Sequence, residues 1–183
     1  TLNQHLGGDA DYIDPAHPVQ RACLEAFERT TGETSPGFGI DGCSAPNYAC
    51  TLHGMARAMA HFAAAPDGSA EARLHQAMRL HPGLVAGEGR ACTALMRAMN
   101  GKVAVKTGAE GFFIAILPEQ KLGIALKAAC GTTRAAECAI AALLVKLGVL
   151  DANHPATLRR MNAPIANWGG VVTGTLKPAT SLL

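Results

Sequence analysis

One lysine stands where an apolar run ends and a polar turn begins. In the stretch AVKTGAEGFFIAIL, residues 104–117, Lys106 is followed by Thr107 and Gly108 before the next apolar run opens. A lysine at the end of a strand can bind a carboxylate or shift a proton, although most such lysines only face water. Lys106 is therefore a candidate whose role depends on what lies beside it.

A second group of reactive side chains lies in the loop GIDGCSAPNYAC, residues 39–50, which we expect to lead into a helix. A helix N-terminus stabilises anions, so Cys43 could act there as a thiolate, a metal ligand or a nucleophile. The alternative is that Asp41 or Ser44 caps the helix and Cys43 is a half-buried thiol. Spacing alone leaves both interpretations open.

Composition and charge exclude several classes of protein. The chain has 183 residues, 49% of them hydrophobic, which is enough for one domain with a sizeable core. A net charge of +2 is too small to indicate binding to nucleic acid or to an anionic membrane. The apolar stretches are shorter than the roughly 20 residues of a membrane span, and no signal pattern opens the chain. We expect a soluble, cytoplasmic, globular protein.

Six cysteines could form a disulfide framework or remain as thiols. They are Cys23, Cys43, Cys50, Cys92, Cys130 and Cys138. Because the chain is long and several of them lie within apolar stripes, reduced thiols are expected. No Cys-x-x-Cys is present, so a zinc site built from this segment alone is not expected.

The periodicity changes from helical to alternating near residue 101. Helices are predicted over residues 18–31, 48–65, 69–80, 91–99 and 132–147, and strands over 102–106, 111–117, 121–127 and 169–178. The predicted fold class is α+β, with helices packed on an antiparallel sheet. We expect a single region over 1–183, mainly helical to residue 100 and mainly sheet plus a C-terminal helix afterwards.

The Lys-Thr-Gly of residues 106–108 is also a signature of penicillin-binding proteins and serine β-lactamases, where it accompanies a Ser-x-x-Lys. The serines here are Ser35, Ser44, Ser69 and Ser181, and none has a lysine three residues later. Either the Lys-Thr-Gly is a coincidence or the nucleophile lies outside this chain. The chain opens at Thr1 without a methionine, so we expect that an N-terminal part is absent.

The segments YIDPAHPVQ, GIDGCSAPNYA, HPGLVAGEGR, VKTGAEG and LGIALK, in this order, resemble the rhizobial-type L-asparaginase family, also called asparaginase II. The resemblance implies a serine β-lactamase-like fold and an L-asparaginase (amidohydrolase) that releases aspartate and ammonia. It implies a Ser-Lys acyl-enzyme mechanism in which Lys106 is catalytic and the serine precedes this chain. It also implies a homodimer.

The resemblance extends to further residues. It implies that Cys43 is a zinc ligand, completed by ligands outside this chain, and that Cys92 lies near the substrate. The substrate's amino group needs an anion, for which Asp41 and Glu110 are the candidates. Two other classes remain open: a penicillin-recognising or glutaminase-type hydrolase on the same fold, and an inactive fragment acting only as a binding module.

Overall fold

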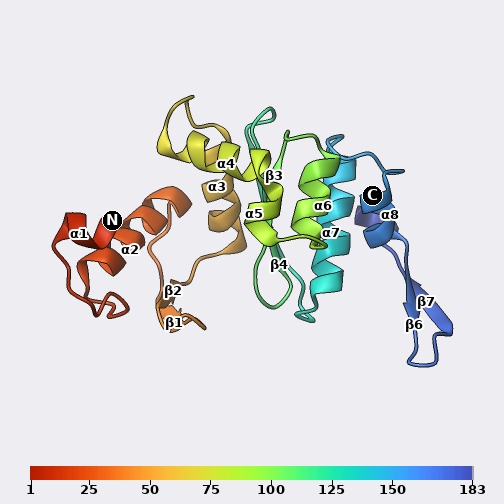
Figure 1. The fold of residues 1–183 in the computed structure, drawn as a ribbon, viewed down its shortest axis with the longest axis horizontal. Helices are drawn as coiled ribbons and strands as arrows, with labels where there is room; N and C mark the ends of the chain where they lie inside the picture. Colours follow the sequence, from red (N-terminus) through yellow and green to blue (C-terminus); the bar gives the residue numbers. More distant parts are fainter. Residues whose placement is uncertain (183) are drawn as a thin grey trace. The chain divides into compact units, whose positions relative to one another are not determined.

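The chain folds into two compact units of unequal size. The computed structural model describes residues 1–182, and the first unit is Thr1–Ala58 while the second begins at Met59 (Figure 1). The single region expected over 1–183 stays a prediction. Helices and small antiparallel sheets make up both units, so the α+β prediction is confirmed.

The first unit is built around one long helix. Its elements are α1 (Leu2–Leu6), α2 (Pro18–Thr31), β1 (Phe38–Ile40), β2 (Pro46–Tyr48) and the start of α3 (Leu52–Ala63). Helix α2 has Pro18 in its first turn, and the His17 ring accepts a hydrogen bond from the backbone N–H of Val19. Gly32, with φ 65°, ends it in the left-handed conformation. The predicted bounds of this helix are confirmed.

The loop ahead of α3 contains a hairpin that the sequence did not indicate. Strands β1 and β2 pair antiparallel, with Phe38 opposite Tyr48, and their turn closes through the N–H of Asp41 and the carbonyl of Ala45. Tyr48 is thus in a strand, and α3 begins only at Leu52. The prediction that a helix begins at residue 48 and follows directly on the Asp41 loop is wrong.

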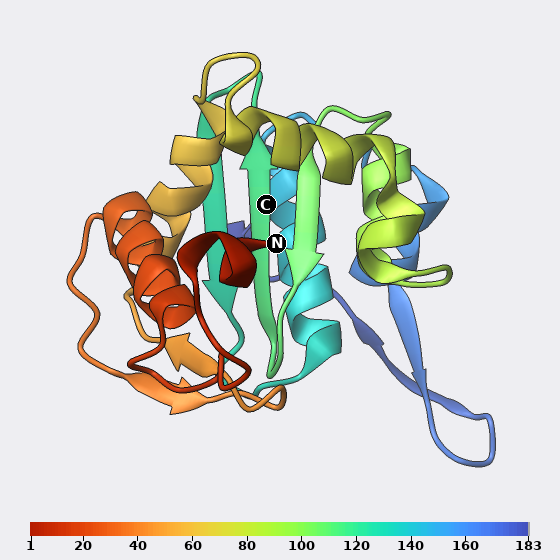
Figure 2. The same ribbon diagram turned by 60° about the vertical axis from the view of Figure 1, so that its left-hand side comes forward.

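The second unit holds the larger core. Its elements are the end of α3, α4 (Ala70–Leu80), α5 (Pro82–Ala86), α6 (Ala91–Ala98), β3 (Ala104–Thr107), β4 (Phe112–Leu117), β5 (Leu122–Lys127), α7 (Thr133–Lys146), α8 (Pro155–Met161), β6 (Ala163–Ala166), β7 (Val172–Leu176) and the 3-10 helix η1 (Thr180–Leu182). Strands β3, β4 and β5 form the predicted antiparallel meander. Helix α7 lies behind these strands in Figure 2.

The two faces of this meander pack against different helices. Phe113, Ala115 and Leu117 alternate along β4 with no exposed surface and join the core formed by α6 and α7. Ile116 points the other way, with Ala104 of β3, and packs with the end of α3 and with α4. Because side chains alternate along a strand, Lys106 lies on the same face as Ala104.

Past α7 the chain forms short elements that periodicity did not predict. Residues 155–161, where the sequence analysis predicts neither helix nor strand, form helix α8, whose first turn is capped by the ring of His154. The predicted last strand shortens to β7 and pairs with β6 in a hairpin. Exposed apolar side chains lie on this hairpin, including Trp168 at 108% relative exposure.

Helix α7 gives a direct test of the core. Leu144 is fully buried, so replacing it with alanine should leave a cavity and lower the free energy of unfolding by about 2–5 kcal/mol. Leu147, three residues later and 37% exposed, provides the control, since Leu147→Ala should cost much less. Urea unfolding followed by far-UV circular dichroism measures both. Equal losses would contradict the assigned buried face of α7.

Candidate active-site residues

Lys106 lies near the end of β3, an edge strand of the meander. It is half-buried and stands opposite Ile114 of β4. Its Nζ donates a hydrogen bond to the carbonyl of Thr107 at 2.7 Å. An ammonium has three N–H donors, so this contact orients the group without using its full hydrogen-bonding capacity.

Cys92 lies beside the same strand end. It is fully buried in the first turn of α6, and its Sγ accepts a hydrogen bond from the backbone N–H of Thr107 at 3.2 Å. Burial raises the pKa of the Cys92 thiol, while the Thr107 hydrogen bond and the charge of Lys106 oppose this with smaller effects. Cys92 therefore acts as a neutral thiol that fixes the peptide next to Lys106.

Glu110 lies in the turn between β3 and β4. Its φ is 54°, and the next residue, Gly111, approaches Ala128 so closely that an added Cβ would lie 3.0 Å from the alanine Cβ. The Glu110 side chain is 85% exposed and its Oε2 lies 3.8 Å from Nζ of Lys127. An ion pair so exposed to water holds the Glu110 carboxylate only weakly. Glu110 is therefore available to bind a ligand.

Asp41 and Cys43 lie in the turn of the β1–β2 hairpin, and both are exposed. An oxygen of Asp41 accepts a hydrogen bond from the backbone N–H of Gly42 at 2.7 Å. The hairpin separates this turn from α3, so both interpretations that place it at the N-terminus of that helix are wrong: the terminus does not act on the Cys43 thiol, and neither Asp41 nor Ser44 caps the helix. Within residues 1–182 no three His, Cys, Asp or Glu side chains form a metal-binding group. The residues around Cys43 thus do not by themselves fit a zinc ion.

The five sequence-predicted residues fall into two sets. Lys106 and Cys92 both contact the backbone of Thr107 in the second unit, Lys106 at its carbonyl and Cys92 at its N–H, and Glu110 lies in the turn that follows. Asp41 and Cys43 share a turn in the first unit. The contact between Cys92 and Thr107 was not visible in the sequence, because the two are fifteen positions apart.

A polar cluster in the first unit was also missed. His17 is 6% exposed, its Nε2 has no hydrogen-bond partner within the described residues, and this nitrogen lies 3.6 Å from an oxygen of Asp9. Gly8 lies against the His17 ring. The sequence HPVQ does indicate a helix start, and the His17 ring contacts the N-terminal end of α2 through the N–H of Val19.

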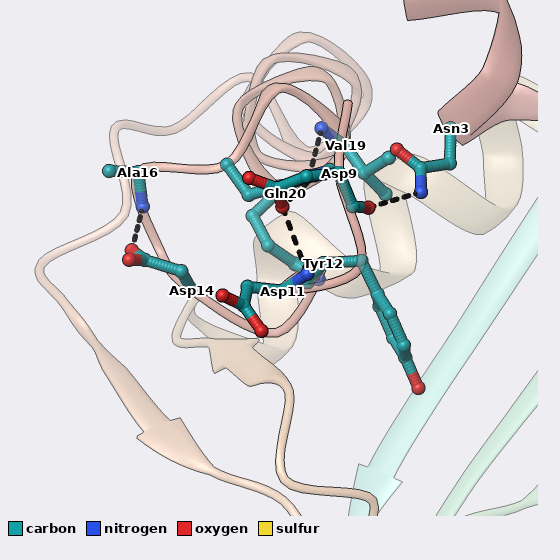
Figure 3. Close-up of polar contacts among 9 residues, drawn as sticks. Asn3, Asp9, Asp11, Tyr12, Asp14, Ala16, Val19 and Gln20 are labelled. Atoms are coloured by element: carbon teal, nitrogen blue, oxygen red, sulfur yellow. Dashed lines mark hydrogen bonds and ion pairs between the residues drawn. The ribbon is translucent and has the colours of Figure 1, made fainter. Parts of the chain in front are cut away.

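The loop around this histidine is held by hydrogen bonds to backbone groups (Figure 3). Asn3 donates to the carbonyl of Asp9 at 2.7 Å, and Gln20 donates to that of Tyr12 at 2.8 Å. Asp14 accepts from the N–H of Ala16 at 2.7 Å. The Gln20 contact fixes this loop to α2, and the Asp14 side chain closes a local turn within the loop.

Comparison with known proteins shows the family of the chain. A model of the L-asparaginase II family matches residues 1–178, which takes in every element from α1 to β7 and all five sequence-predicted site residues. No curated protein matches the chain. Among the described helices, none combines the length and the apolar character needed to cross a membrane.

The cysteines predict an order of chemical labelling. All six are free thiols, and the exposed Cys130 has its pKa lowered by hydrogen bonds from Thr132, first from its side chain and then from its backbone. A lowered pKa keeps the reactive thiolate present at lower pH. Iodoacetamide should therefore modify Cys130 well before the buried Cys92 in the folded protein, as measured by peptide mass spectrometry. In denaturant the two rates should converge; comparable rates in the folded state would refute the assigned burial.

Gly8 should not tolerate a side chain. An alanine Cβ at this position would meet Nε2 and Cε1 of His17 at 2.5 Å, and would also collide with Asn3. Gly8→Ala should lower the free energy of unfolding by about 1–3 kcal/mol, as overpacked sites do. Gly42→Ala is the control, because no atom lies within 4 Å of its added Cβ. Thermal unfolding of the two variants compares them, and an unchanged melting temperature for Gly8→Ala would show that residues 1–9 do not pack on His17.

Proposed function

Because this chain belongs to the L-asparaginase II family, we propose that it carries part of the site that hydrolyses L-asparagine to aspartate and ammonia. The family match over residues 1–178 carries this proposal. The family name implies an amidohydrolase acting on a small molecule.

Lys106 is the proposed catalytic residue. Its half-buried ammonium is oriented by the Thr107 carbonyl at 2.7 Å, and the backbone N–H of the same residue donates to Cys92. Orientation of this kind is what a proton-transferring or substrate-binding group requires. In its neutral form Lys106 would take a proton from a nucleophile, and in its charged form it would hold the substrate carboxylate.

The proposed nucleophile is a serine outside residues 1–183. In the reaction its Oγ loses a proton and bonds to the side-chain carbonyl carbon of asparagine; the carbon–nitrogen bond then breaks and ammonia leaves with a proton. Water next attacks the resulting ester, releases aspartate and returns a proton to the serine oxygen. No Ser-x-x-Lys is present in the sequence to supply this group from within the chain.

The charged groups of the substrate require fixed partners. The α-amino group needs an anion, for which Glu110 and Asp41 are the candidates. Glu110 is supported by its place in the turn after Lys106 and by its weak contact to Lys127, at 3.8 Å, which a ligand could replace. Asp41 is supported by its exposure in a turn closed by backbone hydrogen bonds. Cys92 contributes indirectly, through Thr107.

Zinc, the homodimer and a cytoplasmic location remain proposals. Cys43 would supply one thiolate to a zinc ion, with the other ligands outside this chain, and no step of the reaction is assigned to the metal. Six free thiols in the structure support a reducing compartment.

Substitution of Lys106 tests its proposed catalytic role. In the protein made from its complete coding sequence, Lys106→Ala should reduce the turnover of asparagine by about a hundredfold or more, the scale of general acid-base groups. The melting temperature should change little, because the lysine makes its hydrogen bond to the next residue in the chain. Ammonia release and thermal unfolding measure the two effects.

Lys102→Ala is the matched control, since Lys102 is exposed just ahead of the same strand. Its turnover should equal that of the unsubstituted protein. Near-normal hydrolysis by a folded Lys106→Ala variant would rule out the assigned role. Turnover of glutamine or of a penicillin-type substrate in place of asparagine would instead favour the other hydrolases considered above.

A further inference from the structure

A polar pocket lies where α6, α7 and α8 come together, helices that appear side by side in Figure 1. It has a volume of about 250 Å³ and is lined by Gly89, Arg90, Ala91, Thr133, Glu137, Arg159 and Arg160. Pockets for drug-sized ligands are larger, roughly 300–1,000 Å³. None of the lining residues belongs to the proposed asparaginase site, so the pocket calls for a separate explanation.

The lining is strongly basic for so small a space. Three arginines and one glutamate give it a net charge of +2, which equals the net charge of the whole chain. Arg90 and Arg159 are exposed, whereas Arg160 is buried. A concave surface with clustered charge of one sign concentrates the field and attracts counter-ions.

Two helix N-termini add to this charge. Ala91 is the first residue of α6 and Thr133 is the first residue of α7, and neither helix has a side-chain cap. The caps of α2 and α4 are made by His17 and Ser69. Uncapped first-turn N–H groups need acceptors and carry partial positive charge, so they favour an anion.

The buried side chain of Arg160 independently indicates that a hydrogen-bond acceptor is missing from the pocket. Arg160 is 6% exposed, and its Nη1 donates to the carbonyl of Ala156 at 3.1 Å. Its Nε lies 3.9 Å from Oε2 of Glu137, beyond hydrogen-bond reach, and has no partner within residues 1–182. Burial lowers the pKa of Arg160, while the nearby Glu137 raises it. A buried guanidinium with an unused donor is costly unless an acceptor is supplied.

We propose that this pocket binds a phosphate-type oxyanion, with Arg160 as its buried donor and Arg90 and Arg159 at its mouth. A tetrahedral oxyanion offers several acceptors at once, which suits forked guanidinium groups and the N–H groups of two helix ends. Glu137 opposes the anion electrostatically and limits its affinity. The anion is either free inorganic phosphate or the phosphate group of a small metabolite.

Isothermal titration calorimetry with inorganic phosphate tests this directly. In a chloride buffer of constant ionic strength the 183-residue chain should show one saturable site. Replacing both exposed arginines, Arg90→Ala with Arg159→Ala, should raise the Kd by about tenfold or more. Arg73→Ala, an exposed arginine on α4, should leave the Kd within about twofold. No saturable binding, or the same Kd in the double variant, would overturn the proposal.

Glu137→Gln separates an anion site from a purely structural ion pair. Removing a carboxylate from the lining should tighten phosphate binding, whereas weaker binding would contradict the assigned repulsion. Circular dichroism checks that each variant is folded, and no readout depends on asparagine turnover.

The probe identifies the source of the anion. Tighter binding of glycerol 3-phosphate than of inorganic phosphate assigns the site to a phosphorylated metabolite, and the reverse order assigns it to free phosphate. Acetate binding more tightly than both would contradict the phosphate class.

Discussion

The outer edge of strand β3 sets the arrangement of the second unit. The strand pairs with β4 on one side only, so the backbone groups on its other side need partners that are not a strand. Cys92 of α6 accepts from the Thr107 N–H, and Arg79 of α4 donates to the carbonyl of Gly101, just ahead of the strand, at 2.7 Å. Two helices thereby become fixed to one strand edge. The position of Lys106 follows from this, since its own contact is with the carbonyl of Thr107.

Burial explains which elements the sequence predicted. The meander and α7 place apolar residues at regular spacing against a core, and both were predicted with nearly their observed bounds. Strand β1 is exposed at all three positions and contains Gly39, so no alternation marks it. Helix α8 has seven residues, too few to show a period, and it begins at Pro155 within what looks like a loop. Short exposed elements are fixed by caps and turn closure, which leave little trace in hydrophobic spacing.

The site residues divide in a similar way. Lys106 could be singled out because it stands at a change of pattern, and Cys43 because it lies among turn residues. Neither the contact between Cys92 and Thr107 nor the polar pocket at α6, α7 and α8 could be predicted from the sequence. The pocket is lined by Arg90, just ahead of α6, by Glu137 of α7 and by Arg160 of α8, which share no local sequence motif. Tertiary packing brings such residues together, and no local sequence motif predicts that they will be close in space.

The β6–β7 hairpin has a consequence for spectroscopy. Trp168 is the only tryptophan of the chain, and it is fully open to solvent at the tip of this hairpin. An indole already surrounded by water changes its emission little when the chain unfolds. Tryptophan fluorescence would therefore hardly change on loss of the α6–α7 core. The same indole is a sensitive reporter of any molecule that covers the hairpin, because a shift of its emission to shorter wavelength would have no contribution from folding.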